Sequence, residues 1–153
     1  MMTMQEVEAG RFTVGVFQDM AWAERGVTAL KAAGFPTESL SVLGRESPEL
    51  AAFVEQALGV AAQRLELPGL DAVLARGPLM DALDERELRK SGLGASLCRV
   101  GFQQHDGRIF ETLTARGGVL VAIRSEPAAA EALALLHSYG GGNAAIGAWS
   151  GRV

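Results

Sequence analysis

Cysteine, lysine and histidine are scarce in this sequence of 153 residues. Its single cysteine, Cys98, excludes an intramolecular disulfide and fits a reducing compartment, so we expect a cytoplasmic protein. Lysine occurs only at Lys31 and Lys90 and the net charge is −4, so no basic cluster favours nucleic acid or an anionic membrane surface as a partner. Two histidines and one cysteine, far apart, give no ligand set for zinc, and we expect neither a metal nor a cofactor.

Long apolar runs are also missing. No stretch reaches the length of about 18 apolar residues that a membrane-spanning helix needs, so none is expected. The N-terminal stretch MMTMQEVEAGRF contains two glutamates and no apolar segment, so we expect no signal peptide. Apolar residues make up 48% of the chain and charged residues 21%, which is typical of a globular protein. The length predicts one domain over residues 1–153.

The clearest local pattern that is present runs from residue 117 to residue 140. Residues 119–123 (VLVAI) predict a strand, since they form an apolar run that is rich in β-branched side chains. Ser125 and Pro127 favour a helix start, and Gly140 favours the end of that helix. This stretch therefore predicts a strand followed by a helix.

The same pattern occurs 106 residues earlier. Residues 11–17 (RFTVGVF) predict a strand, Asp19 a helix N-cap, Gly34 the end of that helix and residues 40–43 a second strand. At the same offset, residues 143–149 correspond to this second strand and predict the last strand of the chain. The two units therefore form a repeat of pattern.

Two β-α-β units of this size favour a ferredoxin-like α+β fold, in which four antiparallel strands have helices on one face. We predict the first half at residues 11–44, a helical insertion at residues 45–100, and a helix with the second half at residues 101–153. The strand at 119–123 is apolar on both pleats, so both faces of the sheet must be covered. The insertion or a second copy of the chain could provide this cover, and we expect a homo-oligomer.

Helices are predicted at three places outside the two repeat units. Ser47-Pro48 starts one helix, whose apolar stripe continues to Leu65, and residues 79–90 form a second helix with a charged end. Residues 105–115 form a third helix. In that helix Ile109, Phe110 and Leu113 are expected to face the sheet.

Both halves of the chain resemble the same known protein family. Two stretches resemble the bacterial general-stress-protein domain of the heat-induced 17M type: VGVFQDMAWAERGVTALKAAGFPTESLSVLGRE and GGVLVAIRSEPAAAEALALLHSYGG. In the second stretch, the resemblance includes the Arg-Gly-Gly at 116–118 that precedes the apolar strand. The similarity covers residues 12–45 and 101–143. The chain departs from the family in its more charged middle and at Phe110, where a tyrosine is common. The resemblance implies a stress-associated accessory role and transfers no catalytic residue.

Candidate chemistry is confined to a few polar residues. His105 could act as a general base oriented by Asp106, but a helix-start role for Asp106 is the favoured interpretation. Cys98 lies in an apolar segment and is expected to be a buried, inert thiol. His137, near a helix end, is expected at the surface.

Glycine-rich turns and one tryptophan are the remaining candidates. Gly117 and Gly118, or Gly141 and Asn143, could hold a small ligand through backbone N–H groups. Trp149 could lie in an interface or cover a sheet edge.

Three functional hypotheses follow, of which the first is favoured. It is a non-enzymatic, self-associating accessory or interaction module of a bacterial stress response. The second is a regulatory domain that senses a small molecule at an interface or a glycine-rich turn, by analogy of fold. The third is a cofactor-free enzyme of the dimeric α+β barrel type, with His105 as its base.

Overall fold

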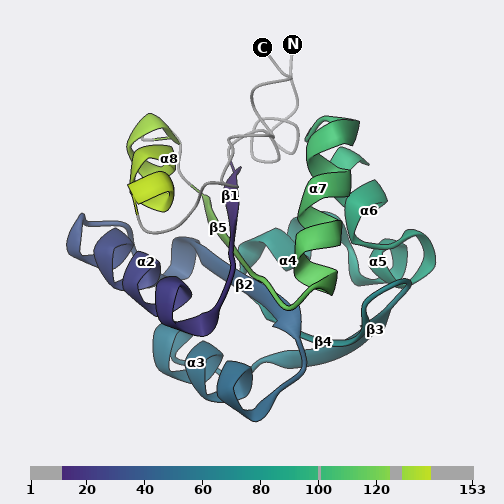
Figure 1. Ribbon diagram of the computed structural model, residues 1–153, viewed down its shortest axis with the longest axis horizontal. Coiled ribbons are helices and arrows are strands. Elements are labelled where there is room, and N and C mark those ends of the chain that lie inside the picture. Colours follow the sequence, from purple (N-terminus) through teal and green to yellow (C-terminus); the bar gives the residue numbers. More distant parts are fainter. Residues whose placement is uncertain (1–11, 100, 125–128, 139–153) are drawn as a thin grey trace.

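A five-stranded antiparallel sheet lies at the centre of the computed structural model, which describes residues 12–99, 101–124 and 129–138 (Figure 1). The strand order is β1-β5-β2-β4-β3. The strands are β1 (Phe12–Phe17), β2 (Leu40–Arg45), β3 (Gln63–Leu67), β4 (Asp71–Arg76) and β5 (Val119–Arg124). The fold class is therefore α+β, as the sequence predicts.

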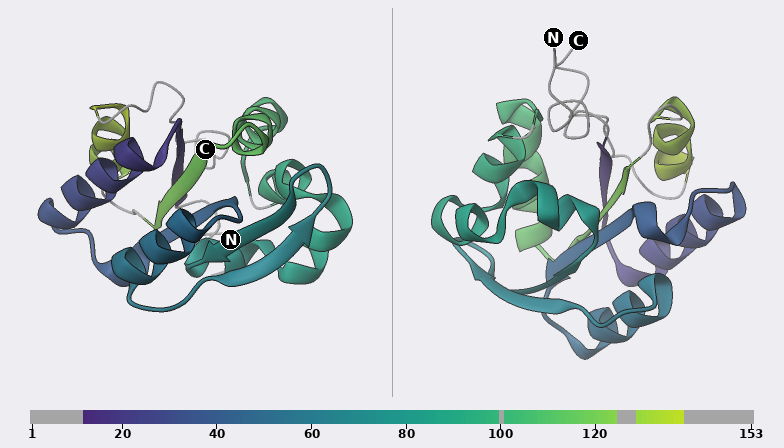
Figure 2. Two further views of the ribbon diagram at one scale, coloured as in Figure 1. Left: turned by 60° about the horizontal axis from the view of Figure 1, so that its bottom comes forward. Right: turned by 180° about the vertical axis from the view of Figure 1, so that it is seen from behind.

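Helices cover both faces of this sheet (Figures 1 and 2). One face is covered by α2 (Met20–Ala32), α3 (Pro48–Leu58) and α8 (Ala129–Ser138). The other is covered by α4 (Pro78–Leu83), α5 (Glu85–Ser91), α6 (Leu93–Arg99) and α7 (Gln104–Ala115). The short 3₁₀ turn η1 (Thr37–Ser39) leads into β2.

Capping residues fix the starts of α2 and α3, as the sequence predicts. Asp19 Oδ1 accepts a hydrogen bond from the backbone N–H of Trp22 at 3.0 Å, and Ser47 Oγ accepts one from the N–H of Leu50 at 3.0 Å. Each bond satisfies one of the backbone donors that a helix start leaves unpaired. Gly34, with a φ of 102°, follows the end of α2.

Strand β5 contributes to a separate core on each side of the sheet. Val121 and Ile123 pack with α2, α3 and α8, whereas Leu120 and Ala122 pack with the layer α4–α7. All four side chains are fully buried. Helices α4, α5 and α6 of the insertion, together with α7, therefore cover the second face from within the same chain.

An approximate two-fold relation joins the repeated units. β1 and β5 are antiparallel neighbours, and Gly15 pairs with Val121. These two residues also correspond at the repeat offset, since 121 − 15 = 106. On either side of them, Thr13 pairs with Ile123 and Phe17 pairs with Val119, so the two pairs are exchanged by the repeat offset. The helices α2 and α8 lie beside each other on the same face (Figure 1). The repeat of pattern is thus a repeat of structure over the described part of both units.

The prediction of a purely helical insertion and of four strands is wrong, because a β-hairpin lies within residues 45–100. α3 ends at Gly59, whose φ of 78° is left-handed, and β3 and β4 follow with Pro68-Gly69 between them. Leu65 continues the apolar spacing of α3 but lies in β3, where its side chain faces the α4–α7 layer. The hairpin adds two strands to the edge of the sheet beyond β2.

Two helical details also differ from the predictions. The helix expected at 79–90 is broken into α4 and α5 at Asp84, whose φ is 72° and ψ is 112°. Ile109 of α7 is 36% exposed, whereas Phe110 is buried and Leu113 packs at the edge of the core. Phe110 and the buried Thr114 are four positions apart and so share one side of the helix, whereas Ile109 lies outside this buried side.

Several predictions lie outside the described residues. These are the helix start at Ser125 and Pro127, the helix end at Gly140 and the last strand at 143–149. Within the described part of the chain, every helix is too short or too polar to cross a bilayer.

Candidate binding groove

Two adjoining hollows form a groove at the end of the sheet where β2 and β3 begin and β4 ends. The first has a volume of about 520 Å³ and lies between the end of α3 and the start of α4. The second, of about 440 Å³, continues between β3 and the corner formed by α4 and α5. Gln63, Met80 and Asp81 line both hollows, so we treat them as one groove.

The first hollow has an apolar wall that comes from two layers of the molecule. Leu58 and Val60 lie at the end of α3 and in the turn after it, Leu40 starts β2, and Pro78 starts α4. Val60 is 43% exposed, because the left-handed Gly59 ends α3 just before it. The groove therefore leaves a large apolar side chain open to solvent.

Charged side chains line both hollows. Four of the lining residues carry carboxylates and two carry guanidinium groups: Glu38, Asp81, Asp84, Glu85, Arg76 and Arg99. Glu85 accepts a hydrogen bond from Gln63 Nε2 at 2.8 Å and lies 2.7 Å from Arg89. Arg99 Nη2 donates to the carbonyl oxygen of Leu83 at 2.7 Å. Several of these charges are therefore held in place by the fold.

Contacts with β2 fix the start of α4, which forms one wall of the groove. The backbone N–H of Leu79 donates to Ser41 Oγ at 2.9 Å in a buried hydrogen bond. A side chain at Gly77 would collide with Ser41 and the carbonyl oxygen of Leu40, and the φ of Gly77 is 124°. Glycine is therefore required where the chain passes from β4 to α4.

The corner between α4 and α5 has a conformation that is rare for a residue with a side chain. Asp84 has a φ of 72° and lines the second hollow. Its Oδ1 accepts a hydrogen bond from the N–H of Arg86 at 3.1 Å and so caps α5. Aspartate tolerates this backbone region better than most residues because its short side chain can bond locally.

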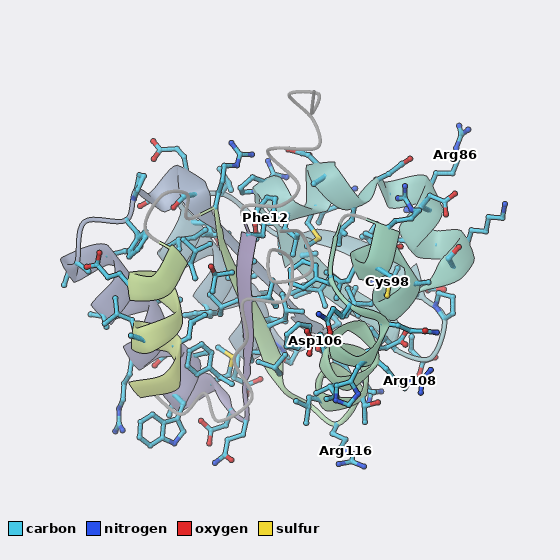
Figure 3. All side chains as sticks on the ribbon, turned by 90° about the horizontal axis from the view of Figure 1, so that it is seen from above. Phe12, Arg86, Cys98, Asp106, Arg108 and Arg116 are labelled. Atoms are coloured by element: carbon cyan, nitrogen blue, oxygen red, sulfur yellow. The ribbon has the colours of Figure 1, made fainter. Side chains whose placement is uncertain are left out.

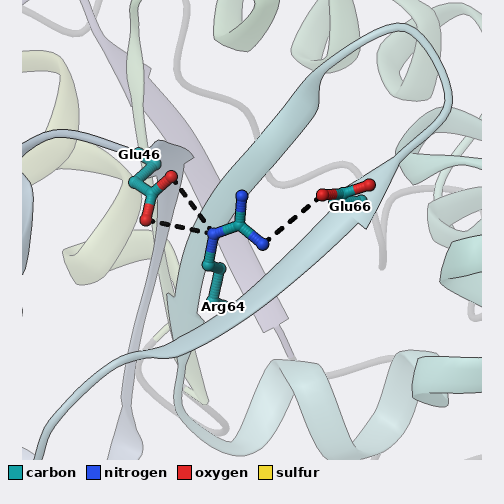
Figure 4. Close-up of polar contacts among 3 residues, drawn as sticks. All are labelled: Glu46, Arg64 and Glu66. Atoms are coloured by element: carbon teal, nitrogen blue, oxygen red, sulfur yellow. Dashed lines mark hydrogen bonds and ion pairs between the residues drawn. The ribbon is translucent and has the colours of Figure 1, made fainter.

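The outer strand of the hairpin, β3, carries charged residues that do not line the two hollows, and Arg64 lies between two carboxylates there (Figure 4). Arg64 Nε lies 3.1 Å from Glu46 Oε2, and Arg64 Nη1 lies 3.4 Å from Glu66 Oε2. The hydrogen bond and the negative charge of Glu46 raise the pKa of Arg64 above its ordinary value. The charge and hydrogen bond of Glu66 raise this pKa further. Charged side chains on an outer strand disfavour pairing with another chain.

A third hollow, of about 400 Å³, lies between α2 and α3. Val27, Lys31 and Phe53 are among its lining residues. The ammonium group of Lys31 donates a hydrogen bond to the carbonyl oxygen of Ala57. This bond satisfies a carbonyl in the last turn of α3, so Lys31 has a structural role here.

The residues proposed for general base catalysis do not line any of these hollows. His105 is exposed in the first turn of α7, and Asp106 beside it is half-buried. In the part of the chain that the structure describes, no hydrogen bond or ion pair joins them. Asp106 is instead placed where a carboxylate stabilises the positive end of a helix.

The glycines proposed for ligand binding have two different surroundings. Gly118 is closely packed, since a side chain there would lie 2.6 Å from Val16 Cγ1 and 2.9 Å from the carbonyl oxygen of Leu113. Gly117, with a φ of 101°, forms the turn after α7. The other candidates for ligand binding, Gly141 and Asn143, lie outside the described residues, as does Trp149.

Cys98 lies on α6, close to the start of α7 (Figure 3). Its side chain is half-buried, and it would lie 3.3 Å from a β-carbon at Gly107. Burial raises the pKa of the Cys98 thiol, an effect that the positive charge of Arg108 opposes. A raised pKa keeps the thiol protonated near neutral pH and lowers its reactivity. Among residues 12–99, 101–124 and 129–138, no three His, Cys, Asp or Glu side chains are grouped to hold a metal ion.

The groove is the feature that the sequence patterns did not indicate. Its residues come from η1, β2, α3, β3, β4, α4, α5 and α6, so no local motif brings them together. The only available signal is Gly59 followed by Val60, a helix end with an apolar residue after it. No protein-family model, curated protein or solved structure matches the chain.

Proposed function

We propose that the chain is a non-enzymatic interaction module whose contact surface is the groove beside α4. The observation that supports this is the composition of the groove, which places the exposed Val60 among charged side chains. Protein-binding surfaces combine an apolar centre with a polar rim in this way. The stress-associated role belongs to this proposal through the sequence resemblance to the general-stress-protein domain, as does a location in the cytoplasm.

The ferredoxin-like relation of the two halves is part of the same proposal. β1 and β2 are parallel, since both pair antiparallel with β5 between them, and α2 connects them. This is the split β-α-β unit from which ferredoxin-like folds are built. The two-fold relation between β1-α2 and β5-α8 supports an equivalent second half.

Self-association was expected because the sheet needed a second cover. The second face of the sheet does not require another copy of the chain, since α4–α7 of the same chain cover it. Sedimentation equilibrium at high micromolar concentration tests self-association separately. A monomer there would remove it and leave the interaction module intact.

Site-specific crosslinking in cells tests the module. We would place a photoreactive phenylalanine derivative at Val60, in the groove, and at Glu131, an exposed residue on α8. A discrete adduct from position 60 that is missing from position 131 is the expected result. No adduct at position 60, or the same adducts from both positions, would contradict the proposal.

A further inference from the structure

The groove has an excess of negative charge. Its lining contains four carboxylates and two guanidinium groups, a net charge of 2 − 4 = −2. One of the guanidinium groups, that of Arg99, already donates to the carbonyl oxygen of Leu83 and lies 3.9 Å from Glu87. Glu85 is likewise engaged, with Gln63 and Arg89, so Glu38, Asp81 and Asp84 remain against Arg76. The charge left for an incoming group is therefore mainly negative, and a cationic group would complement it.

Asp81 lies at the centre of this charge. It lines both hollows, and its side chain is exposed in the first turn of α4. In the described part of the chain it has no hydrogen-bond or ion-pair partner, whereas Glu85 is engaged with Gln63 and Arg89. Asp81 is thus the carboxylate best placed to receive a cation where the two hollows meet.

The apolar wall of the first hollow indicates that a ligand carries an apolar group beside its cationic group. Val60, with Leu58 and Pro78 beside it, lines the first hollow, which Asp81 also lines. A polyamine or another small cation would leave Val60 in water. A peptide with an apolar side chain next to a basic one would cover Val60 and neutralise Asp81 together.

We infer that the groove binds a short cationic segment of a partner protein. A lysine or arginine of that segment lies at Asp81, and a neighbouring apolar side chain packs on Val60. This inference depends on the proposed function and deepens it by naming the chemistry of the partner. The contact is small, so it is transient and sensitive to salt.

Fluorescence anisotropy of the full chain with labelled probe peptides tests the inference. The probe is an octapeptide of alternating lysine and leucine, and the matched control peptide alternates glutamate and leucine. We expect saturable binding of the lysine peptide alone, with affinity falling about tenfold as exposed charges become screened between low and high salt. Equal binding of both peptides, or no binding of the lysine peptide, would overturn the inference.

Variants then locate the contact. Asp81→Lys and Val60→Asp are each expected to weaken binding about tenfold or more. Glu131→Lys is the matched control, because Glu131 is also an exposed carboxylate in the first turn of a helix, on the far side of the sheet from α4. It should change affinity less than about twofold. Circular dichroism checks folding, and Asp81→Asn replaces Asp81→Lys if the latter fails to fold.

Three results would contradict the inference in different ways. If Asp81→Lys behaves like Glu131→Lys, the peptide binds elsewhere. If spermidine binds with the same dependence on Asp81 while Val60→Asp changes nothing, the groove is a site for small cations. If the crosslink from position 60 persists while the lysine peptide does not bind, the interaction module stands and the cationic partner is wrong.

Discussion

Ser41 and Leu79 are joined by a buried hydrogen bond in which the backbone N–H of Leu79 donates to Ser41 Oγ at 2.9 Å. Both residues are fully buried. The bond links the middle of the sheet to the first turn of α4, and α4 forms one wall of the groove. This bond therefore helps to position one wall of the candidate site.

Removing this hydroxyl group should destabilise the protein. Ser41→Ala leaves the buried N–H of Leu79 without its partner, which costs about 1–3 kcal/mol. Ser91→Ala is the matched control, because Ser91 Oγ bonds Glu87 at an exposed site, and it should change stability by less than about 0.5 kcal/mol. Urea unfolding of both variants measures the difference, and equal stabilities would show that the bond contributes nothing.

Gly26 on α2 faces the ring of Phe17 so closely that a β-carbon would overlap the tip of the ring. Phe17 is only 1% exposed and cannot swing away. Gly26→Ala should therefore lose about 1–3 kcal/mol through overpacking, more than the gain of about 1 kcal/mol in helix propensity.

A double-mutant cycle with Phe17→Leu tests this explanation. The smaller side chain makes room for the added methyl group, so Gly26→Ala should be less harmful in the Phe17→Leu background. Additive losses of stability would mean that the ring is not the cause.

His105 and Gly107 lie in the first half of α7 but have opposite environments. His105 is exposed, and His105→Ala should change the unfolding free energy by less than about 0.5 kcal/mol. Gly107→Ala should lose about 1–3 kcal/mol, because its β-carbon would lie 2.7 Å from the carbonyl oxygen of Gly94 on α6. Thermal unfolding compares the two, and a large loss for His105→Ala would reveal a structural role that the exposed position does not explain.

Cys98 should react slowly with alkylating reagents in the native state. Burial raises the pKa of its thiol, so less thiolate is present at pH 8 than in the unfolded chain. Because the folded pKa is the higher one, the stabilising contribution is present below the unfolded pKa and is lost as the pH rises through the folded pKa.

Iodoacetamide labelling, followed by mass spectrometry over a range of pH, measures this difference. The same chain in denaturant is the control. A native rate equal to or above the unfolded rate would contradict the expected protection.

Local signals in the sequence predicted the starts of α2 and α3. Asp19 before α2 and Ser47 before α3 both bond as their residue types indicate. The repeat at an offset of 106 is matched in the sheet, where the corresponding residues Gly15 and Val121 pair. At these two helix starts, residues close in the sequence determine the structure.

The wrong predictions concern segments whose secondary structure depends on contacts between residues far apart in the sequence. Leu65 fits the helical spacing of α3, but Gly59 ends that helix, and packing against the α4–α7 layer makes the segment a strand. The alternation of Leu65 and Leu67 before Pro68-Gly69 was a usable hairpin signal. The break at Asp84 and the groove had no comparable signal, because both depend on how separate elements meet.

The place of β5 in the sheet has a consequence for synthesis on the ribosome. β5 is hydrogen-bonded to β1 on one side and to β2 on the other, yet it begins only at Val119. Until that residue emerges, β1 and β2 lack their common neighbour, and both cores lack the apolar side chains of β5. The nascent chain must therefore keep a divided sheet until β5 has emerged, and the fold can close only in a step that joins distant segments.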